Sequence, residues 1–188
     1  MVEGATRKRR LFVGVELADR ARNACAAASE ELRKIGFAAK YEAPEKLHVT
    51  IAFLGYVEAL RYEAVAGALF AAAERVAPFS LELDKLGAFP HERRPRIVYI
   101  GARDQGSFFH NLSELVRNAY TELGFEFKND SVAHVTIARV KAPNRPLPLI
   151  EFAPIPFRIE RLTLFESRPD KANNTSRYES MEIARLSS

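Results

Sequence analysis

One five-residue sequence occurs twice in this chain. His-Val-Thr-Ile-Ala occupies residues 48–52 and again, 86 positions later, residues 134–138. Because side chains alternate between the faces of a strand, each copy puts a histidine, a threonine and a small alanine on one face. Valine and isoleucine, joined after the first copy by Phe53, take the other face. Two histidines that face each other across a cleft can remove a proton from a nucleophile and donate one to a leaving group, which is what breaking a phosphodiester needs without a metal.

The duplication is what favours catalysis over a structural role. A single histidine in a strand is usually structural, and a fold duplicated for packing alone would preserve Val and Ile but not the polar face. We therefore predict that His48 and His134 are a catalytic pair. Histidine is also a common metal ligand, but two histidines supply only half of a tetrahedral site, and neither motif contains an acidic residue. We expect no metal and no other cofactor.

The surrounding sequence predicts the elements that position these motifs. Periodicity and turn residues predict helices over 19–35, 58–76 and 107–123, and strands over 10–16, 46–55, 79–87, 96–101, 132–140, 157–165 and 177–184. Residues 142–156 hold five prolines and are expected to form an irregular surface connection. The mixed order indicates an α+β fold with antiparallel sheets, and the duplicated motif suggests two similar lobes that each supply one central strand.

Composition limits the remaining possibilities. The 188 residues carry a net charge of +4, an excess that favours an anionic ligand but is milder than in proteins that coat nucleic acid. The single cysteine, Cys25, excludes an internal disulfide and is expected to be a small buried hydrophobe. The N-terminal residues are polar and basic, and the longest apolar runs are too short to span a membrane. We therefore expect a cytoplasmic protein with no membrane contact.

These motifs resemble the RNA 2′,3′-cyclic phosphodiesterase family of the two-histidine (2H) phosphoesterases, whose members carry two His-x-Thr motifs. The likeness runs from residues 10–12 to 177–179, with matches at 44–55, 87–90, 94–96, 134–140 and 162–167; Ala133 stands where a proline often precedes the second histidine. The resemblance implies one bilobal domain over residues 1–188, with two pseudo-symmetric lobes of antiparallel sheet, outer helices and an active-site cleft between the lobes. It implies metal-free hydrolysis of a ribose 2′,3′-cyclic phosphate to a 2′-phosphate, and some members also join or cleave 2′-5′ RNA linkages.

We expect a division of labour within this site. His134 takes a proton from water and His48 protonates the departing 3′ oxygen, although a symmetric site could run either way. Thr50 and Thr136 donate hydrogen bonds to the non-bridging oxygens, and Arg139 adds positive charge. Strict alternation puts Arg139 on the face opposite His134, so it reaches the cleft only if the strand ends, twists or bulges near its end.

Phe12, Tyr178 and His91 are further aromatic and basic residues of interest. Phe12 is expected either to stack on a base or to pack in the core. Tyr178 is expected to pack, and His91 is expected on an exposed basic loop. The expected partners are RNA ends or nucleoside 2′,3′-cyclic phosphates, with no protein partner and a monomeric state. Rival hypotheses are a 2′-5′ oligonucleotide or ADP-ribose 1″,2″-cyclic phosphate as substrate, and a non-catalytic binder of RNA ends.

Overall fold

The computed structural model describes residues 8–103, 107–128, 131–142 and 145–187, and its centre is one antiparallel sheet. Nine strands form this sheet in the order β7-β4-β5-β6-β3-β1-β8-β9, with the short β2 paired to β6. The strands are β1 (Lys8–Glu16), β2 (Lys40–Tyr41), β3 (His48–Glu58), β4 (Phe79–Phe89), β5 (Ile97–Arg103), β6 (His134–Arg139), β7 (Ile155–Ile159), β8 (Arg161–Asp170) and β9 (Thr175–Arg185). The helices are α1 (Asp19–Lys34), α2 (Tyr62–Ala73) and α3 (Phe108–Glu122), with single 3-10 turns η1 (Pro44–Lys46) and η2 (Ala59–Arg61).

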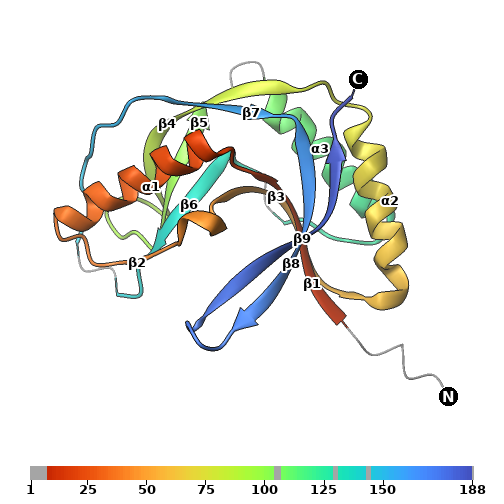
Figure 1. Ribbon diagram of the computed structural model, residues 1–188, viewed down its shortest axis with the longest axis horizontal. Coiled ribbons are helices and arrows are strands. Elements are labelled where there is room, and N and C mark those ends of the chain that lie inside the picture. The colour runs from red at the N-terminus through yellow and green to blue at the C-terminus, as the bar shows by residue number, and fades with distance from the viewer. Residues whose placement is uncertain (1–7, 104–106, 129–130, 143–144, 188) are drawn as a thin grey trace.

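The sheet divides into two halves at the boundary between β3 and β6. One half contains β7, β4, β5 and β6, and α1 packs against β6 and β7. The other half contains β3, β1, β8 and β9, with α2 against β8 and β9 and α3 against β3 (Figure 1). The predicted α+β fold with two antiparallel lobes is therefore confirmed, and each duplicated motif lies on the innermost strand of its own half.

Helix α1 shows why these residues form a helix at this place. Its buried side chains recur at helical spacing and face the sheet, while charged residues cover the exposed side. The chain then turns at Gly36, which has a φ of +70°, and the Phe37 amide donates to the Leu32 carbonyl at 3.0 Å. This left-handed glycine ends the helix, so the chain can return to the sheet as β2.

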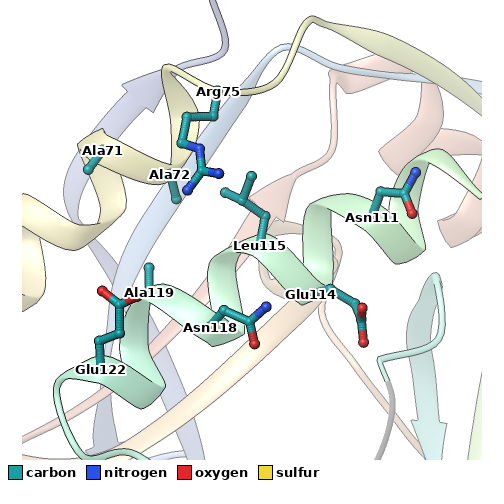
Figure 2. A pocket seen from close by; sticks show the side chains of 9 residues that line it. All are labelled: Ala71, Ala72, Arg75, Asn111, Glu114, Leu115, Asn118, Ala119 and Glu122. Atoms are coloured by element: carbon teal, nitrogen blue, oxygen red, sulfur yellow. The ribbon is translucent and has the colours of Figure 1, made fainter.

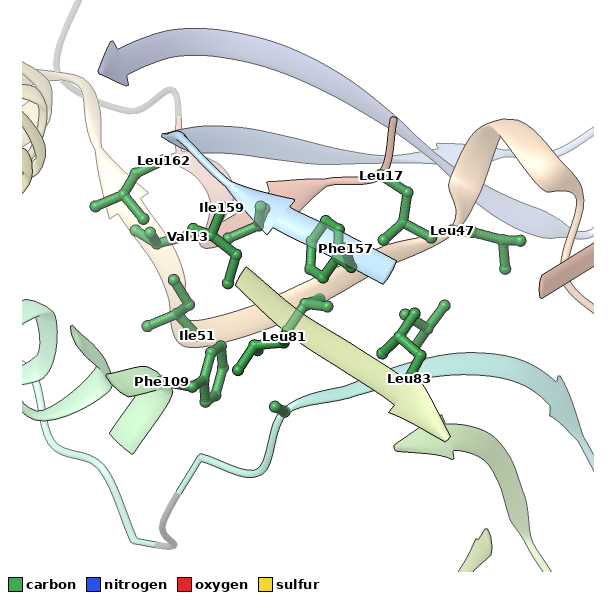
Figure 3. Packing of buried hydrophobic residues seen from close by; sticks show 14 of the residues in the cluster. Val13, Leu17, Leu47, Ile51, Leu81, Leu83, Phe109, Phe157, Ile159 and Leu162 are labelled. Carbon is green, nitrogen blue, oxygen red and sulfur yellow. The ribbon is translucent and has the colours of Figure 1, made fainter. Parts of the chain in front are cut away.

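Apolar side chains from both halves meet in one core. Ile51 of β3 lies beside Phe109 of α3, and Leu81 and Phe157 come from the other half (Figure 3). Each of these four side chains is 6% exposed or less. Because Ile51 packs in this core, the other face of β3 points away from the core.

Several predicted element boundaries were wrong, for identifiable reasons. The predicted helix over 58–76 begins late, because β3 continues to Glu58 and α2 spans only Tyr62–Ala73. The predicted strand over 157–165 is two strands that break at Glu160 and belong to opposite halves of the sheet. The proline-rich stretch is also less irregular than expected, since Pro156 lies in β7. That strand pairs only with β4, and an edge strand tolerates proline.

Two further expectations concern burial and membranes. Cys25 is fully buried on α1, as predicted, and burial raises the pKa of its thiol to about 12. Within the described ranges, no helix is both long and apolar enough to cross a membrane.

Candidate active site

The two histidine motifs lie side by side in the sheet. β3 and β6 are antiparallel neighbours joined at Val49 and Val135. This register sets His48 across from Thr136 and Thr50 across from His134, since residues on either side of an antiparallel pair also face each other. All four polar side chains line one cleft of about 560 Å³. The strands therefore bring together the residues that the duplicated motif predicts.

Each imidazole is held by its own strand in the same way. His48 Nδ1 lies 2.6 Å from the Lys46 carbonyl oxygen, and His134 Nδ1 lies 2.7 Å from the Val132 carbonyl oxygen. A carbonyl only accepts hydrogen bonds, so Nδ1 carries a proton in both rings and Nε2 is the nitrogen left to exchange one. His48 Nε2 is also 3.0 Å from Thr50 Oγ1.

A matching β-bulge follows each histidine. Opposite β1, the register of β3 skips Ile51, and opposite β5 the register of β6 skips Ile137. The extra residue reverses the alternation. Phe53 and Arg139, each five residues after its histidine, therefore line the cleft. Arg139 was expected to reach the cleft only if its strand ended, twisted or bulged, and the structure shows such a bulge.

The same bulges correct two expectations about neighbouring residues. Ala52 and Ala138 were expected beside the histidines, but they are 2% and 0% exposed and belong to the core. Phe53 was expected on the apolar face, but it is 65% exposed and lies on the cleft side. In both strands, the residue after the bulge takes the place that strict alternation assigns to the alanine.

Aromatic rings surround the His48 imidazole. The ring centroids of Phe12 and Tyr178 lie 5.0 and 5.1 Å from that of His48, and Phe12 stacks on Phe165 at 4.8 Å. Phe12 is only 2% exposed, so it supports the histidine from below. Gly14 makes room for this arrangement, because a Cβ there would lie 2.6 Å from the Val49 carbonyl oxygen. Tyr178, expected only to pack, also lines the cleft.

The second histidine has a different aromatic setting. Phe89 and Tyr99 each place a ring centroid 5.3 Å from that of His134, nearly edge-on. The Tyr99 ring crosses Gly87, where a Cβ would lie 2.6 Å from the ring. His134 is therefore braced from β4 and β5, whereas His48 is braced from β1, β8 and β9.

Cations line the cleft together with one carboxylate. Arg10, Lys40, Lys46 and Arg139 all contribute to its walls. Glu42 is the acidic member: its carboxylate oxygens lie 3.0 Å from Arg139 Nε and 2.9 Å from Lys46 Nζ. Such a lining attracts anions while holding one negative charge of its own.

Known proteins share much of this sequence. The family model for LigT-like phosphoesterases matches residues 13–99. A Thermotoga maritima protein named RNA 2′,3′-cyclic phosphodiesterase is 29% identical over 162 residues, which are 84% of this chain and 86% of that protein. An Archaeoglobus fulgidus protein of the same name is 33% identical over 135 residues, 72% of this chain and 74% of that protein. The chain belongs to the LigT-like phosphoesterase family.

Solved structures agree with this assignment. A Thermus thermophilus crystal structure matches this LigT-like phosphoesterase with a TM-score of 0.80 and 28% identity, and it covers 94% of this chain and 97% of that one. The apo crystal structure of Escherichia coli LigT matches with a TM-score of 0.73 and 23% identity, covering 97% and 100% of the two chains, and so shows the shared fold.

In this LigT-like phosphoesterase, the surroundings favour the neutral form of the two histidines and the charged form of the Glu42 carboxylate. Burial lowers the pKa of both imidazoles. The hydrogen bonds to the backbone carbonyls oppose this shift, and for His48 the Glu42 charge opposes it as well. Burial alone would raise the pKa of Glu42. Hydrogen bonds and charge from Lys46 and Arg139 outweigh burial, so the pKa of Glu42 lies below its usual range. The carboxylate is therefore charged at neutral pH, whereas the free imidazoles favour the neutral form.

Sequence analysis assigned no role in the cleft to several residues that line it, among them Glu42, Lys46 and Phe53. Glu42 follows a two-residue strand and Lys46 ends a single 3-10 turn, and elements this short leave almost no periodic signal. Phe53 was misassigned because a bulge is invisible to simple alternation. Comparing the two motifs could have found Phe53. It lies five residues after His48, as Arg139 lies five residues after His134, so a cleft position for one implies a cleft position for the other.

A second hollow lies far from these residues, between α2 and α3. It measures about 410 Å³, and its polar lining consists of Arg75, Asn111, Glu114, Asn118 and Glu122 (Figure 2). No histidine or cysteine lines it. Among the residues that the structure describes, no group of three or more His, Cys, Asp and Glu side chains is placed to hold a metal ion.

Proposed function

We propose that this LigT-like phosphoesterase hydrolyses 2′,3′-cyclic phosphates at RNA ends or on nucleosides to 2′-phosphomonoesters, without a metal. The observation that carries the proposal is the matched pair of histidines in one cleft, each with Nδ1 bonded to a carbonyl and Nε2 left for proton exchange. The names of the Thermotoga and Archaeoglobus relatives support this substrate class.

In the proposed reaction, the ring phosphate lies between the two imidazoles. Neutral His134 removes a proton from water through Nε2, and the water oxygen forms a bond to phosphorus. The bond from phosphorus to the ribose 3′ oxygen breaks, and protonated His48 delivers its proton to that oxygen. The products are a 2′-phosphate and a free 3′ hydroxyl, and the exchange leaves His134 protonated and His48 neutral.

The neighbouring side chains have distinct proposed roles. Thr50 and Thr136 donate hydrogen bonds to the non-bridging oxygens, and Arg139 supplies positive charge to the developing phosphorane. Phe53, which is the exposed ring of the cleft, offers a face to the nucleobase. Phe12 also lines the cleft but is only 2% exposed, so we assign it the packing alternative, as the support under His48.

We further propose that one copy of the chain is sufficient for this chemistry. Both histidines, both threonines and Arg139 come from adjacent strands of one continuous sheet. That continuity supports a single bilobal unit across residues 1–188 that acts as a monomer.

The test is turnover of adenosine 2′,3′-cyclic phosphate in excess EDTA, with the product identified by NMR. Wild-type protein is expected to release adenosine 2′-phosphate. His48→Ala and His134→Ala are expected to turn over about 10³-fold more slowly. His91→Ala is the matched control, because His91 is exposed on a loop and does not line the cleft.

Each other outcome would change the proposal in a defined way. An adenosine 3′-phosphate product would reverse the choice of leaving oxygen. Activity that disappears in EDTA would contradict the metal-free mechanism. No turnover would overturn the cyclic-phosphate proposal, and binding of adenosine 2′-phosphate by His48→Ala would then favour a non-catalytic binder of RNA ends.

A further inference from the structure

Glu42 is an unexpected residue in a cleft that receives phosphate. Its side chain is only 15% exposed, and its carboxylate spans Arg139 of β6 and Lys46 of η1. Its backbone amide donates to the Ile137 carbonyl at 2.9 Å, at the bulge of β6. The carboxylate is therefore fixed in place beside the arginine, and the reaction proposed above makes no use of it.

The second partner of Glu42 is fixed just as firmly. Lys46 Nζ lies 2.7 Å from Thr175 Oγ1 and 5.5 Å from the centre of the Tyr178 ring, and the Lys46 carbonyl accepts the His48 Nδ1–H bond. The Lys46 side chain is only 12% exposed. Lys46 cannot turn toward a ligand without weakening its pair with Glu42, whereas Arg139 is 52% exposed and contacts Glu42 through Nε.

A fixed negative charge acts differently on the substrate and on the product. A cyclic phosphodiester carries one negative charge at neutral pH. A phosphomonoester gains a second negative charge, because its second pKa is about 6. Coulomb repulsion is proportional to the charge of the ligand, so a nearby carboxylate opposes the product about twice as strongly as the substrate.

We propose that Glu42 is a charge-selecting residue, which limits the positive charge of the cleft so that the singly charged diester is bound and the doubly charged monoester is released. This inference rests on the proposed function and adds a device against product inhibition. The groups around the carboxylate are Lys40 of β2, Lys46, His48 of β3 and Arg139, with Tyr178 beyond Lys46.

The experiment measures binding of adenosine 2′-phosphate and of inorganic phosphate by calorimetry at pH 8. Glu42→Gln removes the charge and keeps the shape of the side chain. It is expected to bind adenosine 2′-phosphate about tenfold tighter than wild type, the scale of one unit charge acting on a dianion several ångströms away at a dielectric constant near that of water, about 80. At pH 5, where the monoester is mostly a monoanion, the gain should shrink to about threefold, the square root of the tenfold effect.

The controls separate charge from structure. Glu45→Gln makes the same change of net charge on an exposed residue of η1 that does not line the cleft, so it should leave phosphate binding unchanged. Glu42→Asp keeps the charge and should retain the wild-type ratio of affinities at the two pH values. Glu42→Ala removes the same charge and should also bind tighter, which keeps the test decisive if Glu42→Gln does not fold.

The result that overturns the proposal is a folded Glu42→Gln or Glu42→Ala protein that binds adenosine 2′-phosphate no tighter than wild type at pH 8. An equal gain at pH 5 and pH 8 would also overturn it, since a general increase in affinity does not select by charge. Because binding is measured without turnover, failure of the cyclic phosphodiesterase assay would be recognised separately.

Discussion

The two histidine strands make the same local structure but border different walls. In β3 and in β6, the histidine Nδ1–H bonds to the carbonyl two residues earlier, and a bulge returns the fifth residue to the cleft. That fifth residue is Phe53 in one strand and Arg139 in the other. A duplicated motif therefore holds two histidines in the same way, while the residue after each bulge gives one side of the cleft an aromatic ring and the other side a positive charge.

The largest expected effect comes from the histidines themselves. Replacing either with alanine should lower kcat about 10³-fold, within the range of general acid–base catalysis. A diester whose leaving group needs no proton should restore activity to His48→Ala but not to His134→Ala, because only the acid becomes dispensable. Stopped-flow assays with both substrates measure this difference, and rescue of His134→Ala instead would reverse the two roles.

The next comparison is between Phe53 and Arg139, which lie five residues after His48 and His134. Arg139→Ala should lower kcat/KM about 10²-fold, the scale of losing one transition-state charge contact. Phe53→Ala should raise KM about tenfold, since base stacking contributes about 1–3 kcal/mol.

A ribose 2′,3′-cyclic phosphate without a base separates the two roles. Its KM should be unaffected by Phe53→Ala yet remain sensitive to Arg139→Ala. If loss of Phe53 weakened both substrates equally, its assignment to the base would be wrong.

The pH dependence tests whether the two imidazoles titrate as an acid–base pair. Burial lowers both pKa values below the ordinary histidine value of about 6.5. The bell-shaped profile of kcat/KM should therefore be centred below pH 6.5. It falls at low pH as the base becomes protonated and at high pH as the acid loses its proton. Glu42→Gln removes a charge that raises the pKa of His48, so its alkaline limb should move to lower pH, unlike that of Glu45→Gln. A plateau extending above pH 8 would contradict this pairing.

The smallest expected effect concerns the glycines beside the two histidines. A Cβ at Gly14 would meet the Val49 backbone carbonyl at 2.6 Å, whereas one at Gly101 would meet the Tyr99 ring at 3.2 Å. A ring can shift and a strand backbone cannot, so Gly14→Ala should cost about 1–3 kcal/mol of stability and Gly101→Ala less. Thermal melts of both variants check this order, and equal melting temperatures would show that β1 relaxes more easily than its packing suggests.

Sequence reasoning selected the two histidines that the structure brings into one cleft, because chemistry and strand pattern coincide there. The duplicated motif identified His48 and His134, and the apolar positions Val49 and Ile51 did reach the core. The three helices were also found, since each has an apolar face longer than two turns.

What the sequence left undetected depends on contacts between distant segments. β2 exists as a strand through its pairing with β6, almost a hundred residues later, and it brings Glu42 to Arg139. The bulges at Ile51 and Ile137 arise from register with neighbouring strands, which no local pattern encodes. Sequence pattern thus found the paired histidines of the cleft, whereas the charge environment around them required the tertiary structure.

The seam between β3 and β6 has a consequence for motion. These strands share the single residue pair Val49–Val135, whereas every other pair of neighbouring strands in the described sheet shares two or more. Local opening is easiest where few backbone hydrogen bonds must break. We therefore expect the sheet to open locally at the line that separates its two imidazoles more readily than between its other strands.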